Sequence, residues 1–340
     1  MKENYNRRNF IRMAAVAGAG FTMSGHLNPL YAQNLEGSGK RVGIIGLDTS
    51  HAVAFVNTLN AENAGPEYAG YKVVAAYPQG SKDIKSSVDR VPGYVDSVKK
   101  MGVEIVNSIA ALLAKVDVVL LESNDGRVHL EQALPVFKAG KRIFIDKPIA
   151  GSYADAKAIF QASKKYNVPV FSSSSVRYIE GMSEITAGKI GKVIGAQTYS
   201  PSVPEKTHPD FFWYGIHGIE VLFAAMGTGC KSVSRVHTED TDVVVGVWED
   251  NRIGTFRGTR SGRNVFGGVV FSEKATVTLG AFKGYNPLLL EIVKFFESGV
   301  VPVQPEETLE ICAFMEAADI SKARNGTTVN LAEITEKYKK

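Results

Sequence analysis

Short runs of β-branched residues alternate with helical stretches from residue 41 to residue 175, and this rhythm constrains the fold more than any other feature of the sequence. It is typical of βαβ units, in which parallel strands share a sheet whose two faces are covered by helices. Residues 40–175 are therefore predicted to form a doubly wound, Rossmann-type domain. The expected strands are 41–47, 71–77, 103–106, 117–121, 142–146 and 169–172. The expected helices include 51–61, 129–139 and 153–166.

Consecutive strands without intervening helices follow residue 175, which predicts a second domain over residues 176–330 with a largely antiparallel, open sheet. Asp250 and Asn251 are typical of a hairpin turn between two of these strands. A helix over 214–226 is expected where the domains meet, and the last helix, 306–323, is expected to pack back. The fold class is thus α/β followed by α+β. The expected strands are 193–200, 232–238, 242–248, 252–257, 267–271 and 275–279.

An open antiparallel sheet leaves one face available for a second copy of the chain, so we expect a homodimer or a tetramer. The apolar content of 44% and the charged content of 22% are those of an ordinary soluble globular protein. The two cysteines, Cys230 and Cys312, lie among small and apolar residues and are expected to be buried thiols rather than a disulfide framework or a metal site.

The first 32 residues resemble a removable twin-arginine export signal. Arg7 and Arg8 precede an apolar run over 13–23, and Ala32 supplies a small residue at a cleavage point. The run is too short and too rich in glycine to span a membrane stably. We therefore expect the twin-arginine machinery as a partner and an exported, periplasmic location. The alternative is an uncleaved surface helix.

The positive charge of the chain gathers in this same segment. Residues 1–32 hold four basic residues and one acidic residue, a net +3, which leaves +1 of the total +4 for the rest. A basic surface for nucleic acid is therefore not expected.

The turn after the first predicted strand is where a dinucleotide diphosphate would bind. Gly46 fits the tight-turn position, but the second and third glycines of G-x-G-x-x-G are replaced by Asp48 and His51. A carboxylate would repel a diphosphate, unless Asp48 is turned aside or caps the following helix. Thr49 and Ser50 offer hydroxyls to a phosphate. Capping by Asp48 and direct contact with a cofactor remain open alternatives.

The second predicted strand ends at Tyr77, and no acid follows it where an NAD enzyme usually binds the ribose diol. Ser81 and Lys82 favour a 2′-phosphate, and hence NADP, only weakly, because a solvated loop explains them equally well. The choice between NAD and NADP stays open.

Two further segments carry a family resemblance. Asn124 and His129 follow the fourth predicted strand, and Asp146, Lys147 and Pro148 close the fifth. They resemble the T-P-N-x-x-H and E-K-P signatures of the glucose-fructose oxidoreductase, inositol dehydrogenase and MocA family, with Asp146 in place of the glutamate and His129 two residues late. The segment 214–220 is similar to the helix of that family that bears a catalytic histidine, which would be His217. The resemblance covers nearly the whole mature chain.

The resemblance implies an NAD- or NADP-dependent oxidoreductase that acts on a secondary alcohol or ketone of a sugar or cyclitol. The export signal favours a tightly bound cofactor, because free nucleotide is scarce outside the cytoplasm. Lys147 would hold the substrate oxygen, and His217 would accept or donate the proton. Tyr214 and Glu220 lie three residues to either side of His217, so on a helix they share its face and would orient the ring. The predicted cofactor contacts are Gly46, Asp48, Thr49, Ser50, His51, Tyr77, Asn124, His129, Asp146 and Lys147.

Two other functions remain as alternatives: a non-redox carbohydrate-binding protein that has lost its cofactor turn, and a cofactor-independent lyase that uses Lys147 and His217 as acid and base. No metal site is expected, because His51, His217 and Asp210 show no short ligand spacing. The serines at 172–175 would contact cofactor or substrate or simply form a turn.

Overall fold

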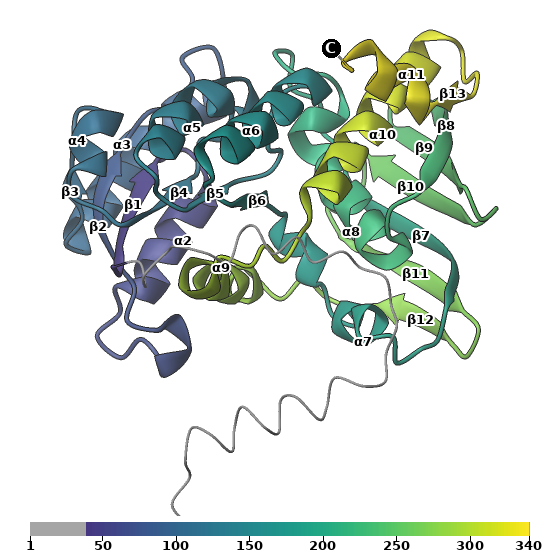
Figure 1. Ribbon diagram of the computed structural model, residues 1–340. Helices are drawn as coiled ribbons and strands as arrows, with labels where there is room; N and C mark the ends of the chain where they lie inside the picture. The colour runs from purple at the N-terminus through teal and green to yellow at the C-terminus, as the bar shows by residue number, and fades with distance from the viewer. Residues whose placement is uncertain (1–38, 340) are drawn as a thin grey trace, which may run out of the picture. The chain divides into compact units, whose positions relative to one another are not determined.

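The computed structural model describes residues 39–339, which fall within one compact unit, and the predicted export signal at 1–32 lies outside them. Two sheets organise this unit (Figure 1). Within residues 39–339, no helix combines the length and the apolar character needed to cross a membrane.

The first sheet has six parallel strands in the order β3-β2-β1-β4-β5-β6. All six predicted strands are confirmed, each slightly shorter than expected. The order reverses at β1 and β4, so the loops after these two strands diverge and leave a crevice at their carboxyl ends. The strands are β1 (Arg41–Ile45), β2 (Lys72–Tyr77), β3 (Glu104–Ile105), β4 (Val118–Leu121), β5 (Ile143–Ile145) and β6 (Val170–Ser172).

Helices cover both faces of this sheet, as the buried, apolar strands require. Along β4, Val118 and Leu120 pack into one core and Val119 and Leu121 into the other. The first core is completed by α2 (Ser50–Leu59), α3 (Lys85–Lys100) and α9 (Asn286–Ser298). The second is completed by α4 (Ile109–Leu113), α5 (His129–Lys138) and α6 (Tyr153–Tyr166).

The second sheet has seven strands in the order β12-β11-β7-β10-β9-β8-β13. It is largely antiparallel, as predicted, and the pair β7 with β10 is parallel. Asn251, at a φ of 67°, forms the predicted turn between β9 and β10. The strands are β7 (Val193–Pro201), β8 (Cys230–His237), β9 (Thr241–Trp248), β10 (Ile253–Thr259), β11 (Gly267–Ser272), β12 (Thr276–Leu279) and β13 (Val329–Asn330).

Helices α8 (Ile216–Met226) and α10 (Pro305–Ala323) pack against one side of the second sheet. A π-helical turn at Phe211–Gly215 leads into α8. Helix α8 lies close to β10 at Gly218, where a Cβ would be only 2.4 Å from the ring of Phe256. Cys230 and Cys312 are both buried and free, as predicted. The remaining short helices are α7 (Met182–Thr186) and α11 (Leu331–Lys337).

A buried arginine ties the second sheet to the segment that precedes α8. The side chain of Arg235 is fully buried and donates to Asp242 at 2.8 Å, Asp319 at 2.7 Å and Asp210 at 2.6 Å. Its guanidinium also lies over the ring of Phe211, 4.1 Å from the ring centre. Removing the arginine would take a donor from all three carboxylates, and that of Asp242 is fully buried.

We predict that Arg235→Met lowers the free energy of unfolding by about 3 to 5 kcal/mol, because one partner of a buried charge network is lost. Urea denaturation followed by circular dichroism measures the change. Arg324→Met is the matched control, since the Arg324 pair with Glu333 is exposed on both sides, and it should change stability by less than about 1 kcal/mol. Equal losses in the two variants would contradict this account of Arg235.

Candidate active site

Gly46 forms the tight turn expected after β1. Its φ is +89°, and its N–H donates to the carbonyl of Tyr77 at 2.9 Å. A Cβ at this position would lie 2.4 Å from the backbone nitrogen of Ser123. Only glycine therefore lets the turn after β1 pack directly on the loop after β4.

Asp48 is turned aside from the start of α2. Its side chain is buried and accepts from Ser87 Oγ at 2.7 Å and from the backbone N–H of Asn124 at 3.0 Å. Burial raises the pKa of Asp48 to about 6. The interpretation of Asp48 as the helix cap is wrong, because Thr49 is the N-cap and its side chain accepts from Ala52 N. Asp48 instead links the loops after β1 and β4.

His51 lies between two buried carboxyl groups. Its Nδ1 is 3.0 Å from Asp146 Oδ1 and 3.8 Å from Glu122 Oε2, and both acidic side chains are fully buried. Burial and the neighbouring Asp146 raise the pKa of Glu122, so Glu122 holds a proton most readily. Despite its own burial, Asp146 has a lowered pKa because of the charges of His51 and Lys147. Glu122 was not among the predicted site residues.

The hydroxyls of the turn also have partners. Thr49 Oγ1 donates to Glu122 Oε2 at 3.3 Å, and Ser50 Oγ lies 2.8 Å from the hydroxyl of Tyr285. The Tyr285 ring is 4.5 Å from the ring of His51. Tyr285 immediately precedes α9, so the second half of the chain covers the start of α2. No sequence pattern pointed to Tyr285, because its role depends on how α9 packs.

The two family-like residues after β4 play different parts. The side-chain amide of Asn124 is buried, and neither its oxygen nor its nitrogen has a hydrogen-bond partner within residues 39–339. Such an orphaned amide suits a ligand. His129 is fully buried, with its ring nitrogens 2.7 Å from the carbonyl of Ser123 and 3.0 Å from that of Ile149. The structure does not support the predicted contact of His129 with a cofactor. Both ring nitrogens face backbone carbonyls, and the side chain holds these loops together.

The loop after β2 is bound to the loop after β4. Ser81 Oγ donates to Asp125, and Arg127 bridges Asp125 and Asp83. His208 Nε2, from the segment between β7 and α8, lies 3.1 Å from Asp125 Oδ1. The hydroxyl of Ser81 is thus engaged by a carboxylate rather than left for a 2′-phosphate.

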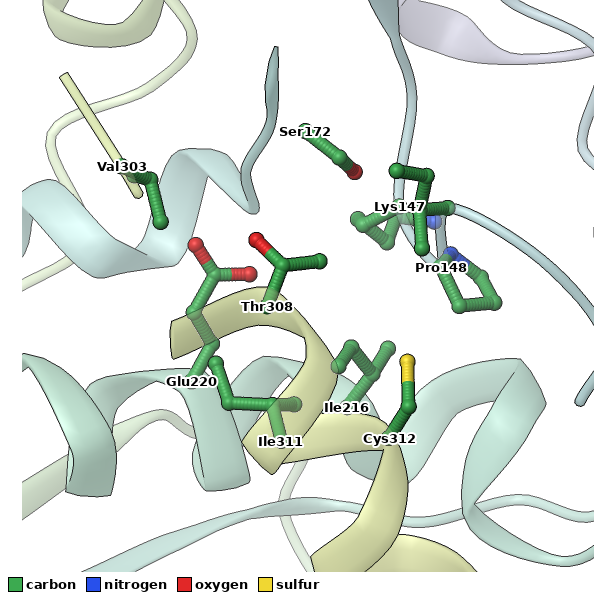
Figure 2. Close-up of a pocket in the computed structure, with 10 residues that line it drawn as sticks. Lys147, Pro148, Ser172, Ile216, Glu220, Val303, Thr308, Ile311 and Cys312 are labelled. Atoms are coloured by element: carbon green, nitrogen blue, oxygen red, sulfur yellow. The ribbon is translucent and has the colours of Figure 1, made fainter. Parts of the chain in front are cut away.

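Lys147 follows β5 in the same crevice. Its side chain is 13% exposed, and its Nζ lies 3.8 Å from Asp146 Oδ2. With Pro148 it lines a small cavity whose opposite side is formed by Ile216 of α8 and Cys312 of α10 (Figure 2). An ammonium group with little access to water is placed to donate to an oxygen atom of a ligand.

His217, in the first turn of α8, is held from the other side. Its Nδ1 lies 2.6 Å from Ser174 Oγ, and Glu220 accepts from Ser173 Oγ at 2.7 Å and from Ser174 N at 2.8 Å. Glu220 was predicted to orient the histidine directly, but it acts through these serines. The rings of His217 and Tyr214 pack edge to face with their centres 4.9 Å apart, as the helical spacing predicted.

Lys147, His51 and His217 share one electrostatic environment although they come from both halves of the chain. Burial lowers the pKa of His217 well below its ordinary value, and the positive charges of Lys147 and His51 lower it further. His217 is therefore neutral near pH 7. Asp210, which the sequence analysis considered as a metal ligand together with His51 and His217, instead accepts hydrogen bonds from Arg235 and Lys322.

The first half of the chain is similar in sequence to known oxidoreductases. Residues 12–174 match the family model described as "Oxidoreductase family, NAD-binding Rossmann fold", the Gfo/Idh/MocA family. An uncharacterized oxidoreductase of Streptococcus pneumoniae is 25% identical over 156 residues, which are 44% of this chain. The matched stretch spans 42% of that relative, less than half of its length.

Solved structures resemble the chain over both halves. A chain described as a probable dehydrogenase from Thermotoga maritima is 20% identical with a TM-score of 0.68, and the match covers 86% of this chain and 99% of that one. Scyllo-inositol dehydrogenase from Lactobacillus casei, solved with NAD(H) and scyllo-inositol, is 17% identical with a TM-score of 0.66 and the same two coverages. At these identities the comparison shows a shared fold, which confirms the predicted fold class.

Two features of the turn after β1 are compatible with a bound dinucleotide. Gly46 keeps the tight turn, and Asn124 offers an unpaired amide beside it. The two substituted positions are turned onto protein partners: Asp48 onto Ser87 and His51 onto Asp146. The turn therefore fits the diphosphate group without the second and third glycines.

We predict that Asp48→Asn removes a pH dependence of stability. The raised pKa of Asp48 means that the folded state binds its proton more tightly than the unfolded state, so Asp48 favours folding below about pH 4 and loses this contribution as the pH rises through about 6. Between pH 4 and 7 the loss is about 3 kcal/mol at most. Asparagine can still accept from Asn124 N and donate to Ser87 Oγ.

Urea denaturation at pH 4 and pH 7 measures this effect. Relative to the wild type, Asp48→Asn should gain about 2 kcal/mol between the two pH values. Asp96→Asn, at an exposed position of α3, is the control and should change the difference by less than about 0.5 kcal/mol. An unchanged difference for Asp48→Asn would show that folding does not raise the pKa of Asp48.

Proposed function

Because residues 12–174 of this chain match the model of the Gfo/Idh/MocA family of NAD-binding oxidoreductases, we propose that the protein interconverts a secondary alcohol and a ketone on a sugar or cyclitol. The observation that carries the proposal is the placement of Lys147 and His217. One follows β5 and the other begins α8, and the charge of Lys147 acts on His217 within a buried crevice. An ammonium and a neutral imidazole at one site are the groups that transfer of an alcohol proton requires.

The proposed cofactor is NAD or NADP. The Gly46 turn and the orphaned amide of Asn124 would hold it at the carboxyl ends of β1 and β4. When bound, the nicotinamide supplies the acceptor or donor of hydride. The inositol dehydrogenase of the same fold, solved with NAD(H) and scyllo-inositol, supports a cyclitol as one substrate class.

His217 accepts the hydroxyl proton of the substrate at Nε2. This requires Nδ1 to carry the ring hydrogen and to donate it to Ser174 Oγ, which lies 2.6 Å away. Glu220 fixes the position of Ser174 by accepting from its backbone N–H at 2.8 Å. Because its pKa is lowered by burial and by Lys147, His217 is unprotonated and ready to act near neutral pH.

Lys147 donates a hydrogen bond to the same substrate oxygen and stabilises the negative charge that develops on it. Asp146, whose Oδ2 lies 3.8 Å from Lys147 Nζ, balances the ammonium charge in the absence of substrate. Tyr214 packs its ring against His217 and limits the rotation of the imidazole.

We further propose that the chain is exported through the twin-arginine pathway with its nucleotide already bound. The support is the Arg7 and Arg8 pair, followed by a short apolar run. The pathway moves folded proteins, and nicotinamide nucleotides are made in the cytoplasm. A tightly held nucleotide would therefore be loaded before export.

We predict that the mature protein, purified from the periplasm, releases about one NAD(H) or NADP(H) per chain on denaturation, measured by mass spectrometry. Gly46→Ala should lose the nucleotide, because a Cβ would collide with Ser123. Gly140→Ala is the matched control: its φ is also positive, at +66°, but a Cβ would meet nothing within 4 Å. A wild-type protein that releases no nucleotide and binds none in calorimetry would refute the redox proposal and favour a lyase or a binding protein.

We predict that His217→Asn and Lys147→Ala each lower kcat/KM by about 10²- to 10⁴-fold, because each removes a group that acts on the reacting oxygen. Nicotinamide absorbance with a panel of inositols and hexoses is the assay. Ser174→Ala should lower kcat by about tenfold with KM little changed, since it removes only the partner of Nδ1. His237→Asn, on β8, is the control and should keep full activity. Wild-type rates for His217→Asn would remove His217 from the mechanism.

A further inference from the structure

Three side chains that can bind a metal converge at the centre of the parallel sheet. His51 lies in the first turn of α2, Glu122 follows β4 and Asp146 follows β5. Because β1, β4 and β5 are neighbours in the sheet, their carboxyl ends bring these residues together. One ligand atom from each residue lies within 4.8 Å of the other two. The sequence did not predict this cluster, since its members are far apart along the chain.

The distances suit a single ion. Zinc binds histidine nitrogen and carboxylate oxygen at about 2.0 to 2.2 Å, so two donors on one tetrahedral ion lie about 3.4 Å apart. The two distances from His51 Nδ1, 3.0 Å to Asp146 Oδ1 and 3.8 Å to Glu122 Oε2, lie on either side of that value. Small rotations of the carboxylates would equalise them.

Two carboxylate oxygens in the cluster lack donors. Glu122 Oε1 and Asp146 Oδ2 are buried, and neither accepts a hydrogen bond from any residue in 39–339. The nearest cation, Lys147 Nζ, lies 3.8 Å from Asp146 Oδ2, which is beyond hydrogen-bond distance. Burying two carboxyl groups side by side is unfavourable, and the charge of a bound cation would offset that cost for both groups.

We propose that His51, Glu122 and Asp146 bind a divalent transition-metal ion, Zn²⁺ or Mn²⁺, through Nδ1 of the histidine and one oxygen of each carboxylate. Once Glu122 has lost its proton, the two carboxylates balance the charge of the ion, and a mixed nitrogen and oxygen donor set suits these metals. Thr49 Oγ1, which donates to Glu122 Oε2 at 3.3 Å, orients that carboxylate. Three protein ligands leave a fourth position for water or a substrate hydroxyl.

Metal binding changes the role of His51. Any hydrogen that His51 Nδ1 shares with Asp146 must leave before this nitrogen can coordinate, either for Nε2 of the same ring or for solvent. The ion would lie close to Lys147, whose Nζ is 3.8 Å from Asp146 Oδ2. The proposal goes beyond the redox function, because metal binding is measured on nucleotide-free protein and does not depend on turnover.

The test uses the mature chain, stripped with a chelator and titrated with ZnCl₂ and with MnCl₂ in separate calorimetry experiments. We expect about one ion per chain for at least one metal. Elemental analysis after dialysis gives an independent count. Glu122→Gln and Asp146→Asn keep the side-chain shape and should weaken binding at least about 100-fold. His51→Ala should abolish it.

His237→Ala is the matched control, because His237 Nδ1 also lies beside a buried carboxylate, 2.7 Å from Asp242, without the convergence of a third ligand. It should bind the metal like the wild type. Circular dichroism establishes that each variant is folded, and the two isosteric variants decide the question if His51→Ala does not fold. Wild-type binding no tighter than that of Asp146→Asn would overturn the proposal, as would equal losses in His237→Ala.

Discussion

The burial of polar side chains at the carboxyl edge of the parallel sheet is the constraint on which the rest of the site depends. Buried polar groups need partners, and here the partners come from neighbouring loops. Asp48 bonds to the backbone after β4, and His51 bonds to Asp146 after β5. These bonds fix the loops after β1, β4 and β5 against one another. The crevice at the topological switch point is therefore a rigid site rather than a set of loose turns.

The second half of the chain completes this edge from two directions. Helix α9 packs on the parallel sheet, and Tyr285 just before it contacts His51 and Ser50. Helix α8 brings His217 to the crevice, where Ser174, two residues after β6, holds its ring. The proposed reaction needs an ammonium from the first half and an imidazole from the second. Both are positioned by contacts that cross between the halves.

The sequence predicted the elements well and their partners less well. The six strands of the first sheet follow from continuous apolar runs, and α6 follows from its apolar periodicity, because these signals are local. Helix α9 packs onto a sheet more than a hundred residues earlier, and no local pattern reports such a contact. The same reason explains why Glu122 was missed, since its importance arises only where β1, β4 and β5 lie side by side. His129 was assigned to the cofactor from a motif, but burial gave it a structural role.

Asp48 shows how a departure from a motif is resolved in three dimensions. The glycine fingerprint left open whether Asp48 is turned aside, caps the helix or contacts the cofactor; in the structure it is turned aside onto Ser87 of α3, and Thr49 is the cap. The central claim is that the crevice holds a nicotinamide ring between Lys147 and His217. A crystal structure of the mature protein grown with NAD⁺ and scyllo-inositol tests it most directly. The account predicts a nicotinamide ring in the crevice and one inositol hydroxyl within hydrogen-bond distance of both Lys147 Nζ and His217 Nε2. An empty crevice, or a nucleotide bound elsewhere on the chain, would contradict it.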